Sequence, residues 1–364
     1  MKRRRLIINI FILFIVIVAA FVLYTNRNAI FLGRDVNRGG ENVVYTMDGA
    51  IQRTFTSFKN RLIICDNQGV SAVKSNGNVA WSVNFQARQP RVDSSGSYLL
   101  STDIGGTDFV LIKNGREQFR KTLEGTIWTA SVNDNGYVAV ASTIPNYKAK
   151  IDIYTRGGEK IFSWNLSHQY PIDLAVADNG KKLVAALVST ADKTLAGNLA
   201  FVDIVKAETV GEPSFANCMF SDIRFLNNGD VLAISDVAVM RYTSDGGLKW
   251  NTNYNSRVLQ KVAVGRSRVV LFFENLRNTS TAESYTLSQG VLKGSYEFDF
   301  DVESVSSRGN VIVASGKRDI AMLRFNARLK TTLAFNNDIR TQEILPNKRD
   351  VFVVHSNNVE VITP

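Results

Sequence analysis

The sequence predicts an all-β fold, an eight-bladed β-propeller closed by an N-terminal strand and preceded by one transmembrane helix. From residue 42 onward, short runs of Val, Ile, Leu, Phe and Tyr alternate with Gly, Asn, Asp and Ser turns, which is typical of strands. A turn motif recurs every 40 to 49 residues, a period typical of propeller blades. An apolar segment follows a basic cluster at the N-terminus.

The apolar segment runs from Leu6 to Tyr24 and is interrupted only by Asn9. A helix of about 19 residues at about 1.5 Å per residue crosses the ~30 Å hydrocarbon layer. A cleaved signal peptide is the alternative, because residues 18–20 (Val-Ala-Ala) resemble a small-residue cleavage site. The apolar core of such peptides is shorter, about 7–15 residues, so we predict an uncleaved transmembrane helix over residues 6–24.

The residues before the helix predict its orientation. Residues 1–5 form a basic tail that contains Lys2, Arg3, Arg4 and Arg5. The positive-inside rule keeps such a cluster in the cytoplasm, so we expect a single-pass protein of the cell membrane with its propeller outside the cytoplasm. Residues 25–41 are polar and lack alternation, and they are predicted to be a tether.

The repeat begins with turns that align along the chain. The motifs DSSG (93–96), NDNG (133–136), ADNG (177–180), LNNG (226–229) and SSRG (306–309) are spaced by 40, 44, 49 and 80 residues, the last being two periods. The turn missing from that double period is found at residues 265–268. Each turn is followed by an apolar second strand, and with one further copy at each end the set predicts eight blades: RLIICD, SYLLST, YVAVAS, KLVAAL, DVLAIS, RVVLFF, NVIVAS and DVFVVH.

A third and a fourth strand follow in each unit, and Trp81, Trp164 and Trp250 occupy the same place in the fourth. We interpret these tryptophans as packing residues between blades. The last unit ends after its third strand, whereas the segment 42–47 precedes the first unit without a partner. That segment is therefore predicted to complete the last blade and remove an open sheet edge, which makes residues 42–364 one domain.

The repeat pattern in VSAVKSNGNVAWSVNF (70–85) and AVMRYTSDGGLKWNTNY (238–254) resembles the PQQ-type propeller repeat. That repeat also occurs in non-enzymatic bacterial envelope proteins such as the outer-membrane assembly propeller lipoprotein. The overall plan is similar to an uncharacterised family of anchored Gram-positive propellers. The resemblance implies a scaffold or binding role in the envelope. The adjacent cysteines that often lie over the cofactor of quinoprotein dehydrogenases are absent, so no cofactor is predicted. The Gly-His and Trp-Asp signatures of WD40 blades are absent as well.

Charge and composition argue against several further classes of function. The chain has 43 basic and 33 acidic residues, a net charge of +10, but without the N-terminal cluster the balance is 39 to 33, or +6. That mild excess does not support a nucleic-acid partner. Cys65, Cys218, His168 and His355 are far apart in sequence, so neither a disulfide framework, nor a metal site, nor a catalytic constellation is predicted. We therefore expect no enzyme, with a hydrolase built on surface loops as a weaker alternative.

Loop length points to one face of the ring. The turns after first and third strands are uniformly tight, whereas the other connections vary in length, as at residues 103–108, 143–150, 189–198, 211–217 and 275–284. Binding residues are often presented on loops over a rigid scaffold, although drift in unconstrained loops is an open alternative.

Candidate binding residues lie at the channel mouth of that face. Asp173, Asp222 and Lys261 recur seven residues before the end of their turns, and His168 and Tyr170 lie in a blade-to-blade connection. We hypothesise that these five form a polar binding mouth; the alternative is that they solvate the channel. The predicted function is a scaffold or adaptor that contacts the lipid bilayer through its helix and another envelope protein through its propeller. A propeller that recognises glycan or anionic wall polymer is the alternative.

Overall fold

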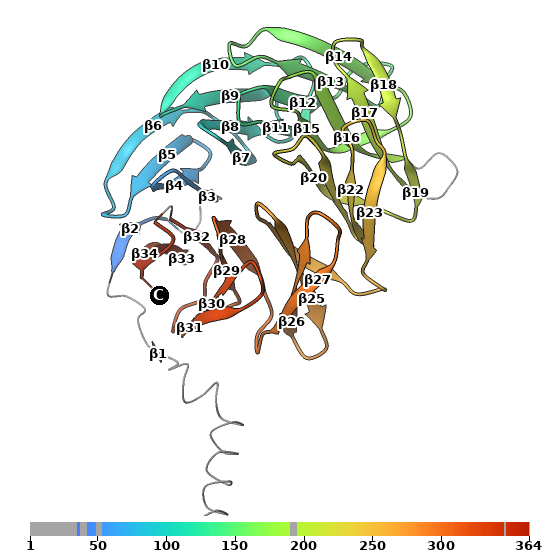
Figure 1. Cartoon of the computed structure of the whole chain (residues 1–364). Helices are drawn as coiled ribbons and strands as arrows, with labels where there is room; N and C mark the ends of the chain where they lie inside the picture. Colours follow the sequence, from blue (N-terminus) through green and yellow to red (C-terminus); the bar gives the residue numbers. More distant parts are fainter. Residues whose placement is uncertain (1–34, 37–41, 49–52, 190–194, 346, 364) are drawn as a thin grey trace, which may run out of the picture.

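The computed structural model describes residues 35–36, 42–48, 53–189, 195–345 and 347–363. Within these ranges the chain forms eight antiparallel blades arranged in a ring (Figure 1), which confirms the predicted eight-bladed propeller. No helix in the described ranges has the length and apolar character needed to cross a bilayer. The predicted basic tail 1–5, the transmembrane helix 6–24 and the tether 25–41, apart from Asp35 and Val36, lie outside the described residues.

Each blade has four main strands with the first strand nearest the axis of the ring, and they pair in chain order except that β2 is the fourth strand of blade 8. Blades 1 to 4 comprise β3 (Thr54–Phe58), β4 (Arg61–Cys65), β5 (Gly69–Lys74), β6 (Val79–Asn84); β7 (Pro90–Ser95), β8 (Tyr98–Asp103), β9 (Asp108–Lys113), β10 (Arg116–Thr122); β11 (Ile127–Val132), β12 (Val138–Ser142), β13 (Ala149–Tyr154), β14 (Lys160–Leu166); β15 (Tyr170–Val176), β16 (Lys182–Ser189), β17 (Ala196–Asp203), β18 (Glu208–Gly211).

Blades 5 to 8 comprise β20 (Phe220–Phe225), β21 (Val231–Ser235), β22 (Ala238–Tyr242), β23 (Leu248–Asn253); β24 (Leu259–Val264), β25 (Arg268–Asn275), β26 (Thr279–Thr286), β27 (Leu292–Glu297); β28 (Ser304–Arg308), β29 (Val311–Ser315), β30 (Asp319–Arg324), β31 (Leu329–Ala334); β32 (Thr341–Ile344), β33 (Val351–Val354), β34 (Asn358–Ile362), β2 (Val43–Thr46).

The second strands form the core of the ring. All eight predicted second strands are confirmed as β4, β8, β12, β16, β21, β25, β29 and β33. Every residue of β8, β12, β21, β29 and β33 is buried. A strand covered on both faces needs a continuous apolar run rather than an alternating one, which is why these segments were the clearest part of the repeat.

The ring is closed as predicted. β2 pairs antiparallel with β34, with Val43 opposite Glu360 and Tyr45 opposite Val359. Beneath this pair, the fully buried Glu360 places Oε1 2.9 Å from Nε2 of His355, which directly follows β33. The two ends of the propeller therefore meet in one blade, and β34 is paired on both of its sides.

Two predicted loops prove to be strand over more than half of their length. Residues 214–216 form β19 (Ser214–Ala216), which pairs with β17 after a break at Pro213, a residue that cannot donate a backbone hydrogen bond. Residues 279–284 lie in β26, so the connection before it is only 276–278. Two buried positions of β26, Ser280 and Ser284, are small and polar, and they bond to Gln260 and to the Phe325 carbonyl. The loops on this face therefore vary in length less than predicted.

Asp35 and Val36, inside the predicted tether, form β1 (Asp35–Val36), which pairs parallel with β31 on the outer edge of blade 7.

Tryptophans of the fourth strands pack against the following blade, as predicted. A Cβ added at Gly115 of blade 2 would lie 2.5 Å from Cγ of Trp81, and one at Gly290 of blade 6 would lie 2.6 Å from Cε3 of Trp250. Trp250 also donates from Nε1 to the Leu287 carbonyl of blade 6 at 2.9 Å. A glycine in the turn thus lets an indole ring lie flush against the next blade.

Replacing Gly115 with alanine is expected to destabilise the protein by about 2 kcal/mol more than replacing Gly105 with alanine. The two glycines have φ of 78° and 79°, so both substitutions carry similar backbone strain. A Cβ at Gly105 meets nothing within 4 Å, whereas one at Gly115 meets the Trp81 ring. Urea unfolding of both variants measures the difference, and equal losses would show that the indole contact contributes nothing.

Candidate binding face

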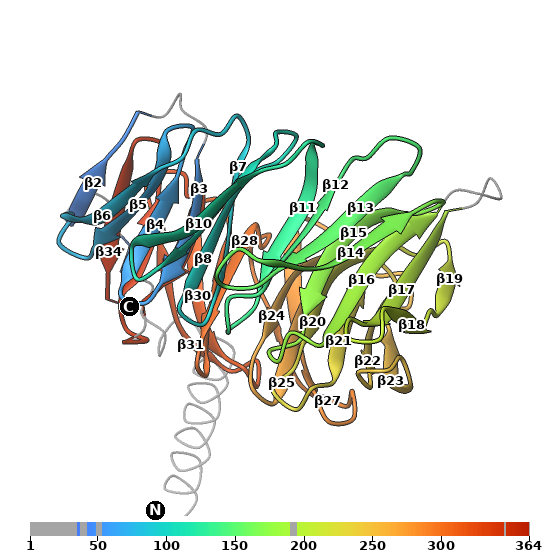
Figure 2. The same cartoon turned by 90° about the horizontal axis from the view of Figure 1, so that it is seen from above.

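The connections between strands lie on two opposite faces of the ring (Figure 2). We name the face of the second-to-third-strand and blade-to-blade connections the loop face. The face of the tight turns after first and third strands is the turn face. All five predicted site residues belong to first strands or to a loop-face connection.

A β-bulge recurs in the first strands of blades 3 to 6. The bulged residues are Trp128, Ile172, Ser221 and Gln260, and each lies between two paired residues of its strand. A bulge inserts one extra residue and re-aims the neighbouring side chains. The predicted positions Asp173, Asp222 and Lys261 directly follow three of these bulges.

The structure brings Asp173 and Asp222 together in a channel cavity of about 1010 Å³, which is also lined by Arg91, Asp93 and Arg224. Asp222 forms an ion pair with Arg224 two residues further along the strand. Oδ2 of Asp173 accepts the N–H of Ile223 in blade 5 at 2.9 Å, so this carboxyl joins the first strands of two blades. Oδ2 of Asp93 accepts the N–H of Val132 in blade 3 at 2.9 Å in the same manner.

Burial is the largest cause that raises the pKa of Asp173, to about 7, and the charge of Asp222 adds to it. The N–H groups of Ile223 and Leu174, together with the positive charge of Arg91, oppose this increase. Burial also raises the pKa of Asp93. The channel therefore contains carboxyl groups whose protonated form the fold favours.

We expect Asp173→Asn to flatten the dependence of stability on pH. An acid whose pKa rises on folding stabilises the fold fully below its unfolded pKa near 4, and this contribution is lost as pH rises through about 7. The asparagine retains an acceptor for Ile223 and does not titrate. Thermal unfolding should show a smaller fall between pH 4 and 7, with the variant more stable at pH 8 by on the order of 1 kcal/mol. Parallel curves for the two proteins would contradict this.

The other three predicted residues lie apart from this cavity lining. Lys261 is exposed and makes no ion pair with any residue that the structure describes. His168 is exposed in the connection between β14 and β15. Tyr170 stacks on Trp128, with ring centroids 5.1 Å apart, and Lys148 lies 5.4 Å from its ring.

Trp128 was missed by the sequence analysis. It is the one tryptophan of the four outside a fourth strand, and that departure from the repeat was the available signal. Its bulge places it beside Tyr170, and 37% of its surface is exposed. The pair forms a flat, partly exposed aromatic surface on the loop face.

The loop face of blades 5 and 6 exposes further apolar side chains. The four connections that precede β20, β22, β24 and β26 each carry one exposed apolar side chain. These are Met219, Val237, Val258 and Leu276, with 44%, 38%, 58% and 92% of their surface exposed. Two of these connections contain consecutive residues with left-handed backbone, Asn255 and Ser256 (φ 53° and 64°) and Arg277 and Asn278 (φ 76° and 57°). Such conformations are costly for non-glycine residues and cluster at binding surfaces.

In the described part of the chain, no group of three or more His, Cys, Asp and Glu side chains is placed to hold a metal ion. Cys65 and Cys218 are buried and separate. Burial raises the pKa of the Cys65 thiol to about 11, so this thiol is unreactive at neutral pH.

The fold places the chain in the class of eight-bladed β-propellers, and it is similar to the propellers of WD40 domains. The profile of a family of unknown function, DUF5711, matches residues 41–363, and the chain belongs to this family. A sequence search of curated proteins gave no significant match.

Three solved structures resemble the fold. The C-terminal WD40 domain of Sif2 has a TM-score of 0.64 at 12% identity, covering 89% of this chain and 96% of that one. Sqt1 of Saccharomyces cerevisiae has a TM-score of 0.64 at 10% identity, covering 89% and 99%. Sqt1 of Chaetomium thermophilum, bound to the N-terminus of ribosomal protein L10, has a TM-score of 0.61 at 10% identity, covering 89% and 100%. At these identities the likeness shows the fold alone.

Proposed function

We propose that this protein is a membrane-anchored scaffold or adaptor of the bacterial cell envelope, whose loop face binds another envelope protein. One observation carries the proposal: all four loop-face connections of blades 5 and 6 expose an apolar side chain. Exposed apolar groups that gather on one face of a soluble domain are typical of protein interaction sites. The Sqt1 structure with a segment of ribosomal protein L10 is an example of a propeller of this class with a protein partner.

The anchor in this proposal is the apolar segment 6–24, and the orientation depends on Lys2, Arg3, Arg4 and Arg5. The propeller then lies outside the cytoplasm. Protease added to wall-stripped cells should degrade the propeller while the membrane is intact. A propeller that is protected until the membrane is lysed would contradict this orientation.

Crosslinking in intact cells followed by affinity capture tests the scaffold role. We expect one stoichiometric envelope protein from the wild type and a loss of at least about tenfold from the double variant Met219→Glu and Val258→Glu. The matched control is Val79→Glu with Leu248→Glu, which changes side chains of 52% and 57% exposure on outer strands. Equal losses from both double variants would contradict docking at the loop face.

The polar mouth predicted from sequence extends this proposal. His168, Tyr170 and Lys261 would contact the partner at the rim, and Asp173 and Asp222 would contact it from the channel. Single alanine variants at His168 and Lys261 should weaken capture while leaving the unfolding midpoint unchanged, because both side chains are exposed. Unchanged capture would remove them from the site.

A glycan-binding propeller is the second candidate, favoured by the stacked Trp128 and Tyr170 with Lys148 beside them. Aromatic rings offer flat apolar surface with a polar edge, which suits a sugar ring. Trp128→Ala separates the two candidates. If Trp128→Ala abolishes retention of the protein on cell-wall glycan, and crosslinking of the wild type captures no partner protein, the glycan function replaces the scaffold.

A further inference from the structure

A second hollow opens on the turn face, where blades 5, 6 and 7 meet. It has a volume of about 580 Å³. The first strands β20 and β24 contact each other less than any other neighbouring pair of first strands. This wider separation of blades 5 and 6 leaves room for the hollow. The apolar floor consists of Phe225, Leu226, Val264 and Phe325.

The charges around this hollow are of one sign. Four arginines line it, Arg224, Arg241, Arg266 and Arg308, and its lining contains no acidic residue. The channel cavity beside it is lined by six aspartates: Asp93, Asp134, Asp173, Asp178, Asp222 and Asp236. Arg224 lines both spaces. The channel therefore changes from acidic along blades 2 to 5 to basic between blades 5 and 7.

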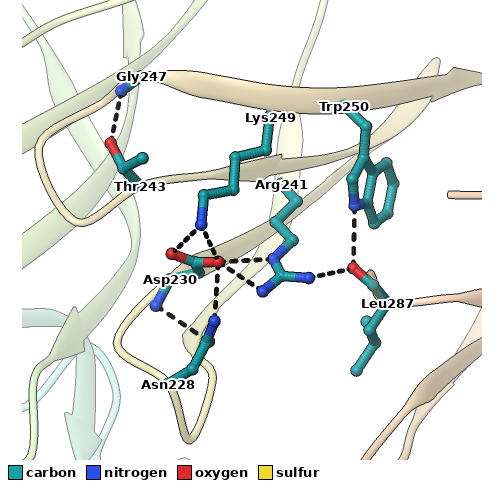
Figure 3. Close-up of polar contacts among 8 residues, drawn as sticks. All are labelled: Asn228, Asp230, Arg241, Thr243, Gly247, Lys249, Trp250 and Leu287. Atoms are coloured by element: carbon teal, nitrogen blue, oxygen red, sulfur yellow. Dashed lines mark hydrogen bonds and ion pairs between the residues drawn. The ribbon is translucent and has the colours of Figure 1, made fainter. Parts of the chain in front are cut away.

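Two of the four arginines are neutralised within the fold. Arg224 pairs with Asp222, and Arg241 lies 2.5 Å from Oδ2 of Asp230, which Lys249 also contacts (Figure 3). In the close-up, Arg241 points between Asp230 and the Leu287 carbonyl of blade 6. These contacts hold Arg241 at the edge of the hollow.

The other two arginines are neutralised less completely. Arg266 is exposed at the β24–β25 turn and makes no ion pair or hydrogen bond with any residue that the structure describes. Arg308 reaches the Ser57 carbonyl at 3.5 Å, and burial lowers its pKa, against which the charge of Glu343 acts. Burial also raises the pKa of Glu343 to about 7, so Glu343 neutralises Arg308 incompletely.

We propose that this hollow binds a small phosphate-bearing molecule, held by Arg266 and Arg308. A guanidinium presents parallel N–H donors that match phosphate oxygens, and Arg266 together with the only partly neutralised Arg308 matches a dianion. Asn227, Ser267 and Ser307 line the same hollow and offer neutral donors. Its volume lies in the range of about 300–1,000 Å³ typical of small-molecule sites. This site is on the opposite face from the proposed protein-docking surface and is independent of it.

Calorimetric titration of the full-length chain in detergent with inorganic pyrophosphate, at about 0.15 M salt, tests the site. We expect saturable binding whose Kd rises at least about tenfold in the double variant Arg266→Gln and Arg308→Gln. The matched control is Arg116→Gln with Arg156→Gln, which removes the same charge from exposed arginines of the turn face in blades 2 and 3. Urea unfolding of each variant confirms that the ring is intact.

Each outcome decides the proposal. Absence of binding to the wild type, or equal weakening in both double variants, would overturn it, since the latter reports only general charge attraction. The source of the phosphate is tested with glycerol 3-phosphate and with phosphatidylglycerol vesicles. Competition between glycerol 3-phosphate and pyrophosphate supports a soluble ligand. Vesicle binding that depends on Arg266 and Arg308, without any binding of the soluble phosphates, would overturn the small-molecule site in favour of a lipid headgroup.

Discussion

Replacing Asp230 with asparagine is expected to lower the free energy of unfolding by about 3 kcal/mol. Asp230 is 6% exposed and accepts hydrogen bonds from Lys249 at 2.7 Å and from Nε of Arg241 at 2.8 Å (Figure 3). Removing its charge leaves Arg241, whose side chain is 12% exposed, without its carboxylate. An unpaired charge in that setting destabilises a fold far more than the intact pair stabilises it.

The effect of Asp230 should depend on pH. Burial opposes its ionisation, but the hydrogen bonds from Lys249, Asn228 and Arg241 together lower its pKa below the usual value. An acid whose pKa is lowered by folding stabilises the fold above its unfolded pKa near 4, and this contribution is lost as pH falls through its pKa in the folded state. The difference between wild type and Asp230→Asn in urea should therefore shrink below about pH 4.

Asp245→Asn is the matched control for Asp230→Asn. Asp245 also pairs with a lysine, Lys182 of the neighbouring blade, but its side chain is 62% exposed. Exposed pairs contribute about 0–1 kcal/mol, so the control should change stability by about 0.5 kcal/mol or less. Losses of similar size in the two variants would show that the Asp230 cluster is no more than a surface ion pair.

Replacing Tyr45 with proline is expected to destabilise the ring by about 3 kcal/mol or more beyond the effect of Tyr45→Ala. Backbone donors of a strand alternate, and Met47 donates to the Asn357 carbonyl at 2.9 Å, so Tyr45 donates toward β34 as well. Alanine removes the side chain but retains that donor, whereas proline removes both.

Urea unfolding and limited proteolysis of the two Tyr45 variants measure the contribution of ring closure. The proline variant should also show faster cleavage near residues 42–48, because β2 would no longer be held against β34. If the alanine and proline variants unfold at the same denaturant concentration, the closing strand contributes side-chain packing and little else.

The blades were predictable because their strongest signals are local. A second strand buried on both sides must be continuously apolar, and a tight turn requires glycine, so both recur in sequence at fixed spacing. The closing strand was predictable by elimination, since residues 42–47 and the last unit each lacked a partner. The parallel strand β1 has two residues and carries no such signal.

The candidate sites were less predictable, because they depend on local irregularity and on contacts between blades. The bulge at Trp128 shifts one residue and brings it onto Tyr170, and nothing in the strand pattern marks that insertion. The pairing of Asp173 with a backbone N–H of blade 5 depends on how two first strands pack. Arg266 and Arg308 are separated by a whole blade repeat in sequence, and the packing of the first strands β24 and β28 brings them to one hollow.

The pairing of β2 with β34 also fixes an order of events during synthesis. β2 is made before every blade, and its partner is made after all of them, so the last blade has only three of its strands until both ends have emerged and met. Contacts between such distant segments form slowly, and unpaired edges are prone to aggregate in the interval. A chain cut short before Asn358 would keep most of its core but would leave β2 and β33 with open edges. Closure of this ring therefore distinguishes complete chains from truncated ones.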